Sequence, residues 1–219
     1  MDQHIYDTVN DFFKDFPLVR LQKGQAVLID GIEKPDILWM RQGIIRMYQI
    51  AEDGTEITLT FFRAPDFFPM RLYLSHRQDE YYFQAFNVVT ARKAPAADVE
   101  TFLKNNPNVL FELTKSFADA ITGLLLRIEQ LSTQNAYHRV ASFMLYLIHT
   151  FGELNSDGNY QVSIHMGHRD IASWVGVARE TVSHQMERLS DAGIVVVQDK
   201  KLVVLDMQQL KSIRNSTGR

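Results

Sequence analysis

The sequence predicts an α+β fold with three parts: an N-terminal domain of β-strands, a long helix, and a C-terminal helix-turn-helix domain with a β-hairpin wing. Three observations lead to this prediction. Short apolar runs alternate with turn residues from about residue 19 to residue 99, an apolar seven-residue repeat follows Pro107, and two short amphipathic helices meet at Gly176. The domain ranges that we expect are 1–106, 107–134 and 135–219.

The composition is that of an ordinary folded protein, and it narrows the chemistry of the chain. The 219 residues are 46% hydrophobic and 22% charged, with a formal net charge of −3. The lack of cysteine excludes disulfides, thiolate zinc sites and cysteine-ligated iron–sulfur clusters. No apolar run is long enough to span a bilayer and the first residues are acidic, so we expect a cytoplasmic protein without a membrane partner.

The strand domain is predicted from its turns. Asp53-Gly54 stands between two apolar runs, where the glycine accepts the positive φ angle that a tight hairpin needs. Further turns are expected at residues 23–25 and 30–31, and a short helix over residues 4–14 precedes the strands. Several short antiparallel strands at this spacing predict a small barrel or sandwich.

The second part is a long helix that begins near Pro107, a residue typical of the first helical turn. After it, apolar residues recur at intervals of seven, which predicts an apolar seam along one side of the helix. Two interpretations stay open. The seam packs on its own domain, or it pairs two chains through Leu110, Phe117, Ile121, Leu124, Ile128 and Leu131.

The third part is predicted from alternating helix and strand signals. We expect helices over residues 135–151, 168–175 and 178–192, a strand over 161–166, and a hairpin whose turn lies at 199–201. The second and third of these helices meet at Gly176. Two helices joined by a tight glycine turn form a helix-turn-helix, and the hairpin that follows is its wing.

The last of these helices carries side chains that suit DNA. Its apolar residues recur at helical spacing and should face the core; they are Ala178, Val182, Met186 and Leu189. In a helix-turn-helix, the second helix enters the major groove with its N-terminal residues at the base edges. The expected base contacts are Arg179, Glu180, Ser183 and His184. The expected phosphate contacts are His168, Arg169, Thr181, Lys200 and Lys201. The alternative is a helix face that is merely solvated.

The segment HRDIASWVGVARETVSHQMERLSDAGIV resembles the helix-turn-helix signature of the Crp/Fnr family of bacterial transcription regulators. The order of the three parts is also similar to that family. The resemblance implies an N-terminal double-stranded β-helix, or jelly roll, then a dimerisation helix, then a winged helix-turn-helix that binds an inverted repeat as a homodimer. It gives base-contacting positions to Arg179 and Glu180, whereas His184 stands where the family usually has arginine.

The resemblance also raises the question of a cyclic nucleotide. The family's N-terminal domain often binds cyclic AMP through a glutamate that holds the ribose and an arginine that holds the phosphate. The residues at those positions here are Met70 and Glu80, and Pro65 and Pro69 replace two glycines of the same loop. Because a carboxylate repels a phosphate and proline has no amide donor, we expect no cyclic AMP binding of this kind.

Aromatic residues gather in the same region and leave two interpretations open. They fill the core, or they line a pocket for an unidentified apolar effector, whose candidate residues are Phe67, Phe68, Met70, Tyr81 and Phe83. His165 and His168 are separated by a strand-to-helix boundary and lack convincing ligand spacing, so we expect neither a metal nor a cofactor.

The sequence therefore predicts a homodimeric, DNA-binding transcription regulator. RNA polymerase and a small-molecule effector are further partners that it leaves open. The alternative is a small-molecule-sensing module whose winged helix mediates protein contacts. We do not expect an enzyme, because the chain has no P-loop, no nucleophile elbow and no zinc-protease motif.

Overall fold

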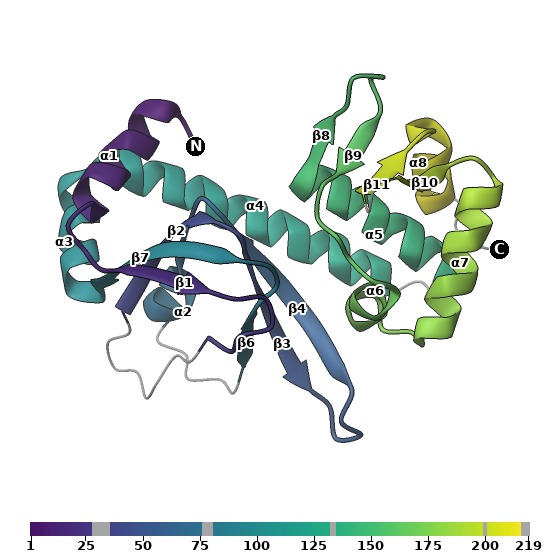
Figure 1. The fold of residues 1–219 in the computed structure, drawn as a ribbon, viewed down its shortest axis with the longest axis horizontal. Helices are drawn as coiled ribbons and strands as arrows, with labels where there is room; N and C mark the ends of the chain where they lie inside the picture. The colour runs from purple at the N-terminus through teal and green to yellow at the C-terminus, as the bar shows by residue number, and fades with distance from the viewer. Residues whose placement is uncertain (28–35, 76–80, 132–134, 199–200, 216–219) are drawn as a thin grey trace. The chain divides into compact units, whose positions relative to one another are not determined.

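The computed structural model describes residues 1–27, 36–75, 81–131, 135–198 and 201–215, and the chain divides into two compact units, Met1–Ala120 and Ile121–Arg219. Each unit is described by itself. Helices and strands both contribute to each unit, as the predicted α+β class requires (Figure 1). Among the described helices, none is long and apolar enough to cross a membrane.

The N-terminal unit consists of short antiparallel strands with helices before, between and after them. Its elements are α1 (Gln3–Phe13), β1 (Leu18–Leu21), β2 (Asp36–Gln42), β3 (Ile44–Ile50), β4 (Glu56–Arg63), β5 (Asp66–Phe68), α2 (Met70–Ser75), β6 (Tyr82–Ala85), β7 (Val89–Pro95), α3 (Ala96–Asn105) and the first part of α4 (Pro107–Leu131). One sheet has the strand order β1-β7-β2-β5 and the other β4-β3-β6. The helix α2 interrupts a region that we expected to consist of strands.

Two glycines allow these sheets to form. The predicted hairpin joins β3 to β4, and Gly54 in its turn has a φ angle of +82°. Gly43, between β2 and β3, has a φ angle of +96°, and a Cβ atom there would lie 2.3 Å from the carbonyl oxygen of Val88. Only glycine fits at residue 43, because any side chain would meet the backbone before β7. The predicted turn at residues 30–31 lies outside the described residues.

The core of the N-terminal unit has two clusters of buried side chains. The first cluster joins the sheet to α1, α3 and the start of α4, and includes Phe13, Trp39, Phe67, Met70 and Leu113. The second cluster lies between the two sheets and includes Met40, Ile45, Phe68, Phe83 and Val89. Aromatic rings supply much of both clusters, since Phe13, Trp39 and Phe67 contact one another in the first, and Phe62, Phe68 and Phe83 in the second.

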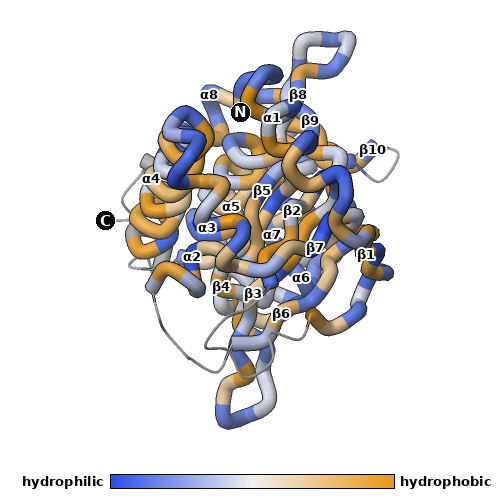
Figure 2. Tube along the Cα trace, turned by 90° about the vertical axis from the view of Figure 1, so that its left-hand side faces the viewer, coloured by the Kyte–Doolittle hydropathy of each residue, from blue (hydrophilic) through white to orange (hydrophobic). Residues whose placement is uncertain are grey.

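The long helix α4 changes its surroundings along its length. Near its start, Leu113 is buried and Phe117 is partly buried against the first cluster. Other apolar side chains of the same helix are exposed, namely Leu110, Phe111, Ile121, Leu124, Leu125 and Ile128. Figure 2 shows the hydrophobic residues of α4. Phe117 therefore packs on its own unit, as the first interpretation of the seven-residue repeat has it. For the exposed residues, the pairing of two chains stays a prediction. The side chain of Leu131 lies outside the described part.

The C-terminal unit surrounds a buried central helix. Its elements after α4 are α5 (Ala136–Phe151), β8 (Gly152–Leu154), β9 (Tyr160–Val162), α6 (His168–Val175), α7 (Arg179–Asp191), β10 (Val195–Gln198), β11 (Lys201–Val204) and α8 (Met207–Asn215). Val140, Phe143 and Met144 of α5 are fully buried, and the strands form one sheet in the order β10-β11-β9-β8. The strand predicted over 161–166 is shorter, and β8 and α8 were not predicted.

Candidate nucleic-acid interface

The turn between α6 and α7 fixes the start of α7. At the beginning of α6, the amide of Gly167 donates to the carboxylate of Asp170 at 2.8 Å. At its end, Gly176 has a φ angle of +68° and donates its amide to the carbonyl of Ala172 at 2.9 Å, which is a left-handed helix stop that favours glycine. Arg139 of α5 then donates to the carbonyl of Val175 at 3.2 Å. The two helices are therefore held by backbone geometry and by α5.

One face of α7 anchors it in the C-terminal unit. Val182 and Leu189 are fully buried and Met186 is nearly so, as the spacing predicted. Opposite them, α6 buries Ile171, Ala172, Trp174 and Val175. Ala178 is exposed, contrary to our prediction, because it is the N-cap of α7 and precedes the first helical turn. Since the apolar face is fixed, the opposite face of α7 is held toward solvent.

The exposed face of α7 carries three of the four predicted base contacts. Arg179, Glu180 and His184 are exposed, whereas Ser183 is half-buried. An arginine can donate two hydrogen bonds to guanine, and a glutamate can accept one from cytosine. Ala178 has no side-chain oxygen to cap the helix, so the amides of the first turn are not capped by that residue.

The structure brings His168 and Ser183 together. Nδ1 of His168 and Oγ of Ser183 lie 2.7 Å apart, and the Ser183 hydroxyl donates to the carbonyl of Arg179 at 3.2 Å. The Ser183 hydroxyl has one hydrogen, and it donates that hydrogen to the carbonyl of Arg179. The proton of the other contact is therefore assigned to Nδ1 of His168, which donates to Ser183. In the neutral ring Nε2 is then a hydrogen-bond acceptor. Sequence reasoning gave these residues separate contacts with DNA and did not find the hydrogen bond.

The predicted phosphate contacts lie at different places in the unit. Arg169 is exposed on the first turn of α6, and Thr181 is half-buried on α7. Lys201 is half-buried at the first position of β11, where it pairs with Gln198 across the wing. Lys200 lies outside the described residues.

Two further arginines hold the helices that carry the interface. The guanidinium of Arg127, on α4, lies 4.4 Å from the centre of the Trp174 ring, and it donates to the Trp174 carbonyl. Burial lowers the pKa of Arg127 below its ordinary value. Arg188 of α7 lies 3.9 Å from the ring centre of Tyr137 on α5. These contacts join residues far apart in sequence, so the helical pattern alone could not reveal them.

The predicted effector residues of the N-terminal unit are divided between its two core clusters. Phe67 and Met70 belong to the first cluster, whereas Phe68 and Phe83 belong to the second, against which Tyr81 is partly buried. This distribution favours the core interpretation for these aromatic residues. The described residues also contain no group of three or more histidine, aspartate or glutamate side chains placed to hold a metal.

The segment that the resemblance assigns to a cyclic nucleotide contains a partly buried ion pair. Oδ2 of Asp66 lies 3.7 Å from the Arg71 guanidinium, and Oδ1 accepts the amide of Phe67 at 2.8 Å. Burial raises the pKa of the Asp66 carboxyl, and Arg71 partly offsets this rise. Met70, at the ribose position that the resemblance implies, is 1% exposed. Glu80 lies outside the described residues.

Comparison with known proteins identifies both units. Residues 18–106 match the family model of the cyclic nucleotide-binding domain, and residues 138–213 match that of the Crp-like helix-turn-helix domain. The two matches follow one another in the chain and cover most of it. The chain belongs to the Crp/Fnr family. The predicted family, the α+β fold class and the role of a transcription regulator with a helix-turn-helix DNA-binding domain are thereby confirmed.

Individual proteins show how far the similarity extends. The global nitrogen regulator of Nostoc sp. is 25% identical over 185 residues, 84% of this chain and 82% of that protein. A CooA mutant from Carboxydothermus hydrogenoformans has a TM-score of 0.78 at 22% identity, covering 98% of this chain and 97% of that one. A CRP/FNR family transcriptional regulator from Thermus thermophilus has a TM-score of 0.69 at 24% identity, covering 92% of this chain and 100% of that one. The two solved structures show a shared fold.

Proposed function

We propose that this Crp/Fnr regulator binds an inverted-repeat DNA site as a homodimer, with one α7 helix from each chain in the major groove. The observation that carries the proposal is the division of α7 into two faces. Val182 and Leu189 fix one face in the core, while Arg179, Glu180 and His184 are exposed on the other. Two such helices would meet successive major grooves about 34 Å apart, and the two half-sites would be inverted because the dimer is symmetric.

The proposed roles differ among the polar residues. Arg179, Glu180 and His184 contact base edges, while Arg169, Thr181, Lys200 and Lys201 contact phosphates. His184 forms one hydrogen bond to guanine where an arginine would form two, so the half-site differs from one that is bound through arginine. Ser183 and His168 position α7, because each already holds the other. A contact from Ser183 to a base would require that hydrogen bond to be exchanged.

The exposed apolar residues of α4 support the homodimer. Ile121, Leu124, Leu125 and Ile128 are between 49% and 62% exposed, and their spacings of three, one and three place them along one side of the helix. Burying such a stripe against the same stripe of a second chain removes it from water. The proposed dimerisation helix spans 107–134, between an N-terminal domain over 1–106 and a DNA-binding domain over 135–219.

The N-terminal domain, as we propose it, does not hold cyclic AMP through the family's ribose and phosphate contacts. Met70 offers no carboxylate to a ribose and is packed in the first cluster. The regulator acts in the cytoplasm and has no catalytic activity of its own, as its composition and motifs predict. RNA polymerase and an effector of the N-terminal domain are partners that the family resemblance leaves open.

Analytical ultracentrifugation of the full chain, alone and with a 40-base-pair duplex of random sequence, tests this proposal. We expect a species of twice the 25.3 kDa chain mass, and duplex binding that weakens steeply as salt concentration rises. A monomeric chain would contradict the dimer. Salt-independent binding, or none, would instead favour a winged helix that mediates protein contacts.

A further inference from the structure

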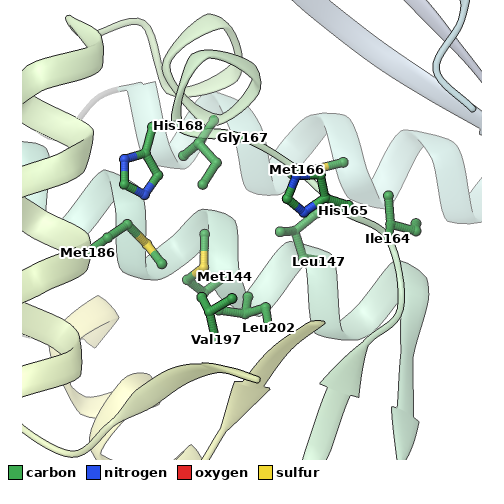
Figure 3. A pocket seen from close by; sticks show the side chains of 11 residues that line it. Met144, Leu147, Ile164, His165, Met166, Gly167, His168, Met186, Val197 and Leu202 are labelled. Carbon is green, nitrogen blue, oxygen red and sulfur yellow. The ribbon is translucent and has the colours of Figure 1, made fainter. Parts of the chain in front are cut away.

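A cavity of about 180 Å³ lies inside the C-terminal unit, behind the proposed DNA-binding face. Its wall is formed by Met144 and Leu147 of α5, Met186 of α7, residues 164–168 before and at the start of α6, and Val197 and Leu202 of the wing. Figure 3 shows these side chains around one space. Nothing in the proposed function uses this cavity.

The size of the cavity matches one small ring. An engineered apolar cavity of about 150 Å³ stays dry and binds benzene. At about 180 Å³, this cavity has room for a ring of the size of benzene or indole. Most of its wall is aliphatic or thioether, so a charged ligand would lose its hydration without compensation, and a neutral one would not.

The chemistry of the wall selects an aromatic ring. Three of the eight methionines of the chain line the cavity, namely Met144, Met166 and Met186. Thioether sulfur makes favourable contacts with aromatic rings, and the unbranched methionine side chain adjusts to the shape of a ligand. In Figure 3 the sulfur atoms of Met144 and Met186 lie next to the space below the His168 ring.

His168 supplies one polar contact. Its Nδ1 atom is engaged with Ser183 on α7, so in the neutral ring Nε2 is a hydrogen-bond acceptor. In Figure 3 one nitrogen of this ring is directed toward α7 and the other toward Met186. A ligand that donates a hydrogen bond, such as the N–H of an indole or the O–H of a phenol, is complementary to that second nitrogen.

The cavity also has an entrance. Met144 at its inner end is fully buried, whereas Val197 is 62% exposed and His165 is exposed. All three residues line the same space, which therefore runs from the surface of the wing into the core. A small molecule can enter without unfolding the unit.

We propose that this cavity is a binding site for a small neutral aromatic molecule with one hydrogen-bond donor. The ring lies against Met144 and Met186, and the donor bonds to Nε2 of His168. Because Met186 belongs to α7 and His168 holds Ser183, an occupied cavity stabilises the present position of α7. Binding of the ligand then raises the affinity for DNA. This effect on DNA rests on the proposed function, but the binding of the ligand to the cavity does not depend on it.

Methyl NMR of the full chain labelled with ¹³C-methyl methionine tests the site directly, with indole as the probe. We expect the signals of Met144, Met166 and Met186 to shift saturably, while those of Met40, Met47 and Met70 in the N-terminal unit stay in place. Saturable shifts confined to the N-terminal methionines, or no saturable shift, would overturn the proposal. The readout needs no DNA, so it separates failure of this site from failure of the proposed function.

Two comparisons sharpen this test. Val197→Phe places a ring at the entrance and should weaken indole binding at least tenfold, while Leu154→Phe, at an exposed site on β8 outside the cavity, should leave it unchanged. 1-Methylindole keeps the ring but loses the donor, and should bind several-fold more weakly than indole. Equal binding of both probes would contradict the contact with His168. If Val197→Phe leaves the methionine spectrum of the free protein unchanged and still binds indole as tightly as the native chain, indole does not bind in this cavity.

Discussion

The imidazole of His168 and the hydroxyl of Ser183 lie 2.7 Å apart, and they join the first turn of α6 to the second turn of α7. The carbonyl of Arg179 extends this contact, because the Ser183 hydroxyl donates to it. The hydrogen bonds therefore end at the backbone of a residue that we propose to contact a base. Two residues that the sequence predicts as DNA contacts are therefore also bonded to each other, and they join α6 to the helix that carries the proposed base contacts.

Removing the Ser183 hydroxyl should loosen this arrangement. We expect Ser183→Ala to lower the free energy of unfolding by about 0.5–1.5 kcal/mol, the usual contribution of one hydrogen bond. Urea unfolding followed by circular dichroism measures the change. Ser190→Ala is the matched control, since Ser190 is exposed on the same helix. Equal stability of the two variants would show that the hydrogen bond does not hold α7.

Loss of a phosphate contact should weaken binding to every sequence alike. Arg169 is exposed on α6, and we expect Arg169→Ala to reduce the slope of log affinity against log salt by about 0.9, the value for one phosphate contact. Fluorescence anisotropy with two unrelated duplexes measures both slopes. Lys104→Ala, on α3 of the N-terminal unit, removes one charge as a control and should leave the slope unchanged. If Arg169→Ala leaves the slope unchanged, Arg169 does not contact a DNA phosphate.

A charge on the exposed stripe of α4 should separate the dimer. Ile128 is 62% exposed in the single chain, and in the proposed dimer Ile128→Asp would bury an unpaired carboxylate. We expect the dimer dissociation constant to rise at least tenfold in sedimentation equilibrium. Asp119→Lys changes an exposed charge on the other side of α4 and should have little effect. If Ile128→Asp dimerises like the native chain, the stripe is not the interface.

The partly buried carboxyl of Asp66 should make the stability of the N-terminal unit depend on pH. Burial raises its pKa in the folded state above the ordinary value of 3.8, so the folded state keeps the proton to a higher pH than the unfolded state does. The contribution of Asp66 to stability therefore falls as the pH rises from the ordinary pKa of 3.8 toward the higher pKa of the folded state. We expect Asp66→Asn to gain stability relative to the native chain between pH 4 and pH 7 in urea unfolding. A constant difference across that range would contradict the raised pKa.

Local signals were enough to predict much of the helix-turn-helix. The expected helix over 168–175 has those bounds in α6, and α7 differs from the expected 178–192 by one residue at each end. Gly176 gives the reason, because a positive φ angle does not continue a right-handed helix and glycine adopts it without steric strain. The hairpin at Gly54 was predictable for the same reason, since the backbone there depends on a single residue.

Features that depend on contacts between distant residues could not be predicted. The strand β8 exists because it pairs with β9 across a loop, and its three residues have no strand pattern of their own. Trp174 of α6 is covered by Arg127, 47 residues earlier, and this contact has no periodicity that a sequence could display. The repeat on α4 predicted an apolar seam, but it could not tell Phe117, which packs on its own unit, from Ile128, which is exposed.

The most direct test of the central claim, that the exposed face of α7 contacts DNA bases, is a pair of selections from a randomised duplex library. The native chain and Arg179→Ala are each selected and their bound sequences compared. We predict that the native chain recovers an inverted repeat, and that Arg179→Ala recovers the same repeat with preference lost at one base pair in each half-site, a cost of roughly 1–3 kcal/mol there. Recovery of an identical motif by both proteins would contradict the assignment of Arg179 and, with it, this placement of α7.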